Sequence, residues 1–211
     1  MAGLPPAGER VTDKILDFYY DVGSPNAYFA WKALAGVTAR TGLKINMLPV
    51  LIGGIFKSTN NQPPWMAYSN IPAKLDYERL EINRFIETHK LTAFKFNSAF
   101  PVNTLLSMRA AIAAQRAGVH DAFFPAAFNA IWEDDKNISQ PDVLASVLAN
   151  AGLDGAALVA ATQEPEIKQG LMDATAACVA RGVFGLPSFF LGDDLYFGKD
   201  RIWQIEQALK T

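Results

Sequence analysis

The stretch Lys14-Ile-Leu-Asp-Phe-Tyr-Tyr-Asp-Val-Gly-Ser-Pro-Asn-Ala-Tyr-Phe-Ala-Trp31 decides the fold of this chain. It begins with β-branched and aromatic residues, a composition typical of a strand. Gly23 allows a tight turn, and Pro25, with its fixed φ and no N–H, suits the first turn of a helix. Apolar residues then recur at helical spacing over residues 26–40, and Gly42 follows as a stop signal. The sequence therefore predicts a strand, a tight turn and a helix.

Ser24 falls at or beside the N-cap of this predicted helix. Several unpaired N–H groups and the positive end of the helix dipole lie behind that position, so an anion placed there would be stabilised. Serine is also a preferred N-cap residue in its own right. This stretch alone therefore favours a capping role for Ser24 over a functional one.

Composition sets the bounds on the class of protein. The chain has 211 residues, 50% hydrophobic content and a net charge of -2, which indicates a globular protein of one domain or two merged ones. No basic block points to nucleic acid, and no segment approaches the roughly 20 apolar residues of a membrane span. The single cysteine, Cys178, excludes an internal disulfide and a CxxC motif. We expect a cytoplasmic protein whose residues 1–13 form a flexible tail and not a signal peptide.

The remaining chain reads as one more parallel strand, a block of helices and a final hairpin and helix. Residues 43–50 form the second strand, and the long piece from Leu51 to Ile71 is expected to be an irregular loop. Pro and polar residues mark the starts of the later helices. These starts are Pro72, Asn103, Asp121, Pro141, Asp154, Pro165 and, after a hairpin over residues 187–197, Asp200. The two outer parts together have the element order of a thioredoxin fold.

Three local features add a family resemblance. Ser24-Pro25 opens the first helix, Val183-Phe-Gly-Leu-Pro-Ser188 precedes the third strand, and Phe197-Gly-Lys-Asp-Arg201 leads into the last helix. Together with Lys74-Leu-Asp-Tyr-Glu-Arg79, these stretches resemble the 2-hydroxychromene-2-carboxylate isomerases and, more distantly, the kappa-class glutathione transferases. The likeness covers nearly the whole chain from Lys14 to Leu209.

The resemblance implies an α/β, thioredoxin-like fold with an inserted all-helical domain, as in the bacterial disulfide-forming oxidoreductases. Residues 14–62 and 183–211 would form the thioredoxin-like domain, and residues 63–182 the helical insertion.

The resemblance also implies a glutathione site. Ser24 matches the serine that hydrogen-bonds and stabilises the glutathione thiolate, and Pro187 matches a cis-proline. Leu186 would pair its backbone with the cysteinyl part of glutathione, as a peptide adds to a sheet edge. The loop that grips the γ-glutamyl end is matched by Lys199, Asp200 and Arg201. Polar residues of the substrate pocket are matched by Lys57, either Asn60 or Asn61, Arg84 and Asn103.

Structural explanations exist for most of these residues. Asp200 is equally well explained as a helix cap alone, and Lys57 as a solvated lysine. The aromatic pair Phe94 and Phe96 is better explained by core packing than by a pocket. Three further residues carry no predicted function. We expect His89 and His120 to be surface histidines, because neither has partners at metal-ligand spacing, and Cys178 to be a small core residue.

The resemblance thus implies a glutathione-dependent isomerase that interconverts 2-hydroxychromene-2-carboxylate and trans-o-hydroxybenzylidenepyruvate, or a related aromatic carboxylate, by reversible thiolate addition. Relatives in the family are dimers, which implies a homodimer. Two alternatives remain open: a kappa-like glutathione transferase acting on electrophiles, and a non-catalytic thioredoxin-fold binding module. No metal is expected.

Overall fold

The structure is a computed structural model that describes residues 14–210. Its strands are β1 (Ile15–Tyr20), β2 (Lys44–Pro49), β3 (Ser188–Leu191) and β4 (Asp194–Phe197). Its helices, some with proline at the first position, are α1 (Pro25–Thr41), α2 (Ile52–Thr59), α3 (Pro64–Ala67), α4 (Pro72–His89), α5 (Leu105–Arg116), α6 (His120–Trp132), α7 (Pro141–Asn150), α8 (Gly155–Ala161), α9 (Pro165–Ala180), the short 3₁₀ turn η1 (Lys199–Arg201) and α10 (Ile202–Ala208). The tail predicted over residues 1–13 lies outside the described residues.

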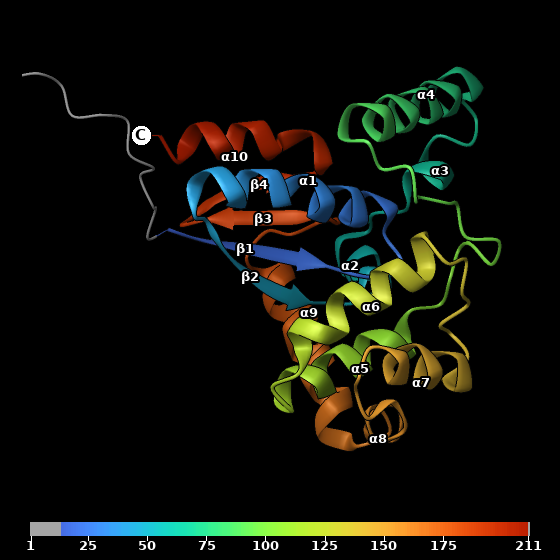
Figure 1. The fold of residues 1–211 in the computed structure, drawn as a ribbon. Coiled ribbons are helices and arrows are strands. Elements are labelled where there is room, and N and C mark those ends of the chain that lie inside the picture. Colours follow the sequence, from blue (N-terminus) through green and yellow to red (C-terminus); the bar gives the residue numbers. More distant parts are fainter. Residues whose placement is uncertain (1–13, 211) are drawn as a thin grey trace, which may run out of the picture.

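The four strands form one mixed sheet in the order β2-β1-β3-β4. β1 runs parallel to β2, with Phe18 opposite Met47, and antiparallel to β3, with Phe18 opposite Phe189. Helices α1 and α10 lie above the sheet and α9 lies below it (Figure 1). This arrangement confirms the predicted thioredoxin-like fold.

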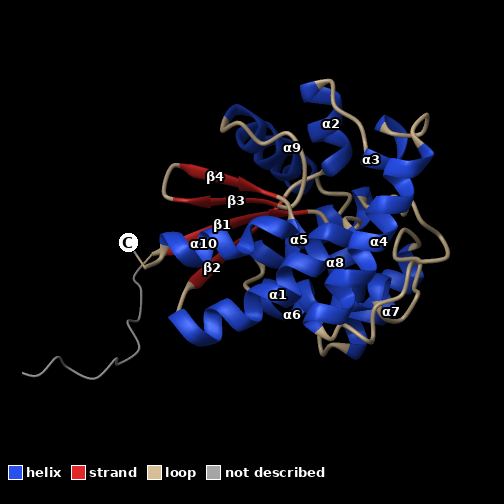
Figure 2. Cartoon of the chain, turned by 90° about the horizontal axis from the view of Figure 1, so that it is seen from above, coloured by secondary structure: helices blue, strands red, loops and turns tan. Residues whose placement is uncertain are grey.

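The helical block lies beside the sheet, at the end where β1 leads into α1 (Figures 1 and 2). Its helices α5 to α8 gather on one side of that end, and α3 and α4 form a separate lobe on the other side (Figure 1). The turn that carries Ser24 therefore lies where the sheet domain meets the inserted helices.

Aromatic side chains join the sheet to the helical block. Tyr20 of β1 packs edge to face on Phe124 of α6, with ring centroids 4.7 Å apart, and Phe18 contacts the same ring at 6.3 Å. Phe128 and Trp132, on the same helix, are completely buried. Burying each such ring contributes about 1.5–3 kcal/mol, so this cluster holds the end of β1 rigidly against α6.

The predicted loop from Leu51 to Ile71 is largely helical, which corrects the sequence interpretation. α2 occupies residues 52–59 and buries Ile55, and α3 occupies residues 64–67. Gly53 and Gly54 disfavour a helix locally, but Ile55 gains a fully buried position beside Cys178 and Val183. Tertiary packing therefore outweighs the weak local propensity.

Three predicted helix caps are also corrected. α5 begins at Leu105, with Thr104 at the cap position, while Asn103 Oδ1 accepts from the Leu105 N–H at 3.1 Å in a local turn. α6 begins at His120, one residue before Asp121. Asp200 caps nothing, because it lies inside η1 and its carboxylate pairs with Lys199 instead.

His120 is buried, which contradicts its assignment to the surface, whereas His89 is exposed as predicted. The His120 Nε2 lies 2.7 Å from the Tyr20 hydroxyl, and burial lowers the pKa of the imidazole. Cys178 is fully buried in α9, as expected. Within residues 14–210, no group of three or more His, Cys, Asp or Glu side chains could hold a metal ion. None of the described helices is long and apolar enough to cross a membrane.

Candidate active site

Ser24 is the N-cap of α1, and its side chain faces the cis peptide bond between Leu186 and Pro187. The Ala27 N–H donates to Ser24 Oγ at 3.2 Å, which confirms the capping role. The Ser24 hydroxyl in turn donates to the Leu186 carbonyl at 3.4 Å, a long and weak hydrogen bond. The hydroxyl hydrogen can therefore be redirected to a better acceptor without much loss.

Asp21 fixes the turn that precedes Ser24. Its Oδ1 accepts from the Gly23 N–H at 2.9 Å, and its Oδ2 accepts from the Ile52 N–H at 2.9 Å and from the Thr104 hydroxyl at 3.0 Å. These partners belong to the turn itself, to the start of α2 and to the start of α5. Complete burial of the carboxyl raises the pKa of Asp21, and these three hydrogen bonds oppose that rise only in part. One buried side chain therefore holds together three segments around Ser24.

The rest of the turn is held by the helical block. The Trp132 indole N–H donates to the Val22 carbonyl at 2.8 Å. Gly23 has no room for a side chain, because a Cβ built there would lie 2.7 Å from Thr104 Cγ2. Glycine is therefore required here for close approach, and not for a left-handed backbone conformation.

The Leu186–Pro187 peptide bond is cis, as predicted, and the Gly198 N–H donates to the Pro187 carbonyl at 2.9 Å. The Leu186 N–H makes no hydrogen bond with another described residue. Leu186 contacts Ser24 through its carbonyl, and its N–H can donate to an extended ligand backbone. A second cis bond, Phe100–Pro101, was not predicted.

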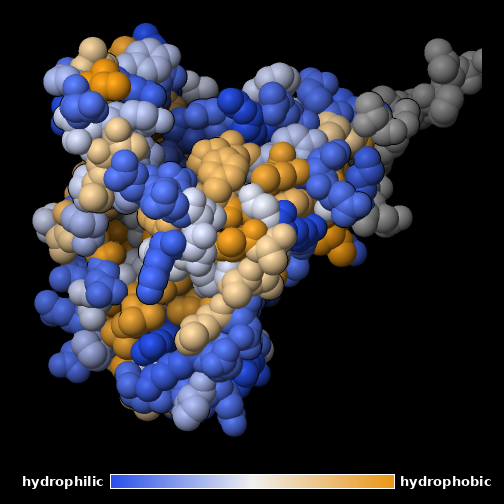
Figure 3. All heavy atoms as spheres, turned by 180° about the vertical axis from the view of Figure 1, so that it is seen from behind, coloured by the Kyte–Doolittle hydropathy of each residue, from blue (hydrophilic) through white to orange (hydrophobic). Residues whose placement is uncertain are grey.

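A cavity of about 840 Å³ opens in front of Ser24 and Leu186. Its walls come from the β1–α1 turn, α2, α3, one face of α4, and the segments before α5 and β3. Seen from behind, hydrophobic side chains show in a hollow beneath the lobe that α3 and α4 form at the upper left (Figure 3). The mainly apolar lining includes seven aromatic residues: Phe56, Trp65, Tyr68, Phe96, Phe100, Phe184 and Phe197.

The cavity brings together only part of the predicted site. Ser24, Leu186 and both candidate asparagines, Asn60 and Asn61, line it. The Asn61 amide donates to the Phe184 carbonyl at 2.8 Å, which ties α2 to the loop before Pro187. The residues of the predicted set that do not line it are Lys57, Arg84, Asn103, Pro187, Lys199, Asp200 and Arg201.

Lys199 and Asp200 instead border a second cavity of about 300 Å³, which α1, α4 and α10 enclose. Lys199 is only 7% exposed, and its ammonium donates to Asp200 at 2.6 Å and lies over the Phe85 ring at 4.7 Å. Arg201 borders neither cavity. The γ-glutamyl role expected for these three residues stays a prediction.

Several lining residues were not predicted from the sequence. Phe96 was assigned to the core with Phe94, and no residue of α4 other than Arg84 was predicted. Phe94 does pack on Phe29 at 4.6 Å, whereas Phe96 is half exposed in the cavity wall. On α4, the lining residues Leu75, Glu78, Arg79 and Ile82 follow helical spacing, a signal that was present in the sequence.

Comparison with known proteins places the chain in a family. A model of the DSBA-like thioredoxin domain matches residues 15–210. The chain belongs to the DSBA-like thioredoxin family. In this chain a serine stands at the start of α1, and the one cysteine lies buried in α9.

Named relatives of this DSBA-like protein are enzymes. A 2-hydroxychromene-2-carboxylate isomerase from Pseudomonas sp. (strain C18) is 28% identical over 198 residues, which cover 92% of this chain and 90% of the relative. The glutathione S-transferase kappa 1 of Rattus norvegicus is 25% identical over 202 residues, which cover 90% and 88%. These similarities support an isomerase- or transferase-like function at the level of the family.

Solved structures agree with this fold. A 2-hydroxychromene-2-carboxylate isomerase superposes with a TM-score of 0.81 at 24% identity, covering 93% of this DSBA-like chain and 94% of that chain. A probable DsbA oxidoreductase from Streptomyces coelicolor gives a TM-score of 0.71 at 16% identity, with 93% and 88% covered. The first of these superposes more closely than the second.

Proposed function

We propose that this protein is a glutathione-dependent isomerase that interconverts 2-hydroxychromene-2-carboxylate and trans-o-hydroxybenzylidenepyruvate, or a closely related aromatic carboxylate. One observation carries the proposal: a weakly engaged serine hydroxyl lies at a helix N-terminus and opens onto a cavity walled by aromatic rings. The names of the relatives fit this chemistry.

The residues around Ser24 suit a bound thiol. A thiolate placed at the start of α1 would accept the Ser24 hydroxyl hydrogen and would lie at the positive end of the helix dipole. Both effects lower the pKa of a thiol, which is about 8.5 when free. Serine cannot form a mixed disulfide with that thiol, so the site holds the thiol without consuming it.

Leu186 suits the peptide part of glutathione. Its free N–H and its carbonyl, which now receives only the long bond from Ser24, form a short strand-like edge beside the cavity. A cysteinyl backbone that pairs with this edge would be oriented by two main-chain hydrogen bonds. Leu186 would then direct the thiol toward Ser24.

The cavity walls suit an aromatic substrate. Rings such as Trp65, Phe100 and Phe184 can stack on a planar conjugated acid and exclude water from it. When bound, glutathione would supply a nucleophilic sulfur that adds reversibly to a conjugated double bond and so permits rotation. Among the polar groups of the lining, the amide of Asn60 and the amide oxygen of Asn61 could contact a substrate carbonyl or phenol.

The test is to incubate 2-hydroxychromene-2-carboxylate with the protein, with and without glutathione, and to follow the ultraviolet spectrum and the product mass. We expect isomerisation that requires glutathione and yields a product of unchanged mass. A product that carries the mass of glutathione would indicate the transferase suggested by the kappa-class relatives. No reaction and no glutathione binding at millimolar concentration would contradict both enzyme assignments.

A further inference from the structure

The long helix α4 contributes the charged groups of the main cavity. Among the described lining residues, only Glu78 and Arg79 carry a charge, and the apolar Leu75 and Ile82 flank them on the same helix face. The cations that the family resemblance indicated, Lys57 and Arg84, do not line this cavity. Arg79 is therefore the cationic side chain in the described lining that an anionic ligand would contact.

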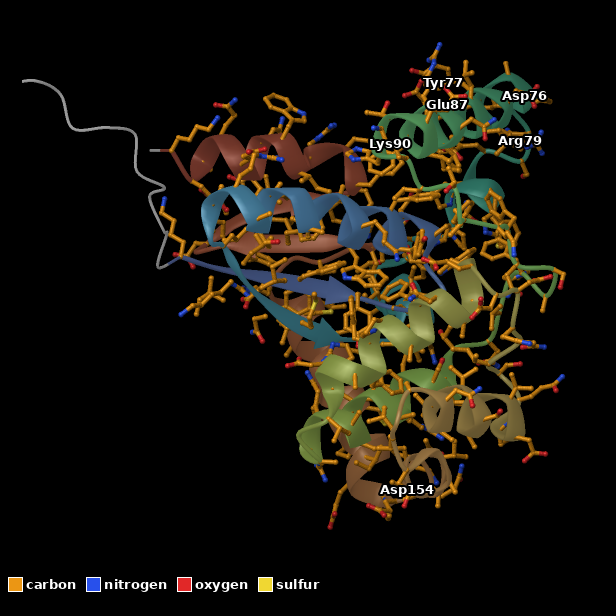
Figure 4. All side chains as sticks on the ribbon, in the orientation of Figure 1. Asp76, Tyr77, Arg79, Glu87, Lys90 and Asp154 are labelled. Atoms are coloured by element: carbon orange, nitrogen blue, oxygen red, sulfur yellow. The ribbon has the colours of Figure 1, made fainter. Side chains whose placement is uncertain are left out.

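Arg79 is held only loosely in the structure. Its Nη1 donates to Asp76 Oδ1 at 2.9 Å, one turn earlier on α4, and the two side chains are 74% and 70% exposed. Such an exposed pair contributes little, because water screens it and two long side chains must be ordered. Figure 4 shows Asp76 and Arg79 together at the end of α4 next to α3, with Tyr77 on the upper side. A carboxylate ligand could replace Asp76 at small cost.

The other cations of α4 are differently placed. Lys74 lies over the Tyr68 ring at 3.2 Å and does not line the cavity. Arg84 makes the same kind of pair as Arg79, with Glu81 three residues earlier, but outside the cavity. The helix thus carries two arginines in equivalent pairs, of which Arg79 lines the cavity and Arg84 does not.

From this placement we propose that Arg79 is the residue that selects carboxylates among the aromatic compounds entering the cavity. The ring would lie among the aromatic walls while the carboxylate stays at the mouth and forms a two-point contact with the guanidinium. Glu78 lies beside Arg79 and repels an anion that is not paired with Arg79. An uncharged analogue feels no such repulsion, and it therefore needs Arg79 much less than an acid does. This inference rests on the proposed function, which supplies the aromatic acid.

The test compares an acid with its uncharged isostere in the absence of glutathione. trans-2-Hydroxycinnamate and its primary amide are titrated by calorimetry into the wild type, Arg79→Gln and Arg84→Gln, after circular dichroism shows that each variant is folded. We expect Arg79→Gln to weaken acid binding about tenfold, which corresponds to the loss of one hydrogen bond to a charged group. The affinity for the amide should stay within about twofold of the wild-type value. Arg84→Gln should leave both affinities unchanged.

The possible failures are distinct. If Arg79→Gln leaves the ratio of acid to amide affinity unchanged, or if Arg84→Gln lowers that ratio equally, Arg79 does not select the carboxylate, while the proposed function stands. If the wild type binds neither acid nor amide at millimolar concentration, the cavity does not take aromatic acids, and the proposed substrate class is overturned along with Arg79.

Discussion

Replacing Gly23 by alanine would force a side chain into the contact between the β1–α1 turn and α5. The added Cβ would lie 2.7 Å from Thr104 Cγ2, about 1 Å closer than a normal carbon–carbon contact. Thr104 cannot rotate away freely, because its hydroxyl is bonded to the buried Asp21. Overpacking of this kind costs about 1–3 kcal/mol, so we expect Gly23→Ala to lower the free energy of unfolding by that amount.

A second substitution removes the clash without removing the hydrogen bond. Thr104→Ser deletes the methyl group that the alanine would meet and keeps the hydroxyl that donates to Asp21. Alone it should cost about 1 kcal/mol for one buried methyl. In the double variant the new Cβ fills the space of the lost methyl, so the two costs should largely cancel.

The assay is urea unfolding of the wild type, both single variants and the double variant, followed by circular dichroism. We expect the double variant to be more stable than the sum of the single effects predicts by at least about 1 kcal/mol. Additivity within about 0.5 kcal/mol would refute the reasoning, because the turn would then tolerate a side chain without contacting Thr104.

Three further predictions follow from buried groups and exposed surfaces. Burial raises the pKa of Asp21 above 3.8, so the contribution of this carboxyl to stability is full below about pH 3.8 and declines as pH rises through the folded pKa. In urea unfolding, the stability advantage of the wild type over Asp21→Asn should therefore be larger at pH 4 than at pH 7. The opposite trend would contradict the assignment. Burial raises the pKa of Cys178 from 9.0 to about 12, so native alkylation by iodoacetamide at pH 8 should be slower than in urea by about a thousandfold, whereas similar rates in the two states would show that the thiol is accessible. We also propose a homodimer, since α4 exposes Tyr77 and Leu80 outside the cavity; light scattering at micromolar concentration should give twice the chain mass, and a monomer mass would disprove it.

Much of the fold could be predicted because local signals and tertiary packing agree there. Pro25, Pro72, Pro141 and Pro165 each open a helix in the structure, as proline at a first helical position favours. Runs of β-branched and aromatic residues near both ends of the chain predicted the strands, so the order of the elements along the chain followed. Ser24 was found for the same reason, since a helix start is a local feature.

The errors fall where long-range contacts decide the outcome. Residues 51–71 contain glycine and asparagine pairs that favour a loop, yet burial of Ile55 stabilises a helix. The side chain of His120 is buried because Tyr20, a hundred residues away, offers it a hydrogen bond.

The sequence indicated the chemistry of the candidate site, but not which of the predicted residues face the cavity. A resemblance can match Lys199 and Asp200 to a ligand loop, but which cavity they face depends on how α4 packs over α1. Arg79 could have been found from the spacing of Leu75, Arg79 and Ile82, had the cavity face of α4 been known.

The central claim is that Ser24 stabilises the thiolate of bound glutathione. Ultraviolet titration of the thiolate in the glutathione complex measures this directly, with Ser24→Ala as the variant and Asp154→Ala as the matched control. Asp154 caps α8 in the same way, by accepting from the Ala157 N–H at 3.0 Å, and lies far from the cavity (Figure 4).

Both substitutions remove one cap and should cost about 1 kcal/mol of stability. Only Ser24→Ala should raise the pKa of the bound thiol, by about one to two units, the equivalent of a charge-assisted hydrogen bond of about 1.5–3 kcal/mol. A bound-thiol pKa that is the same in Ser24→Ala and Asp154→Ala would contradict the account.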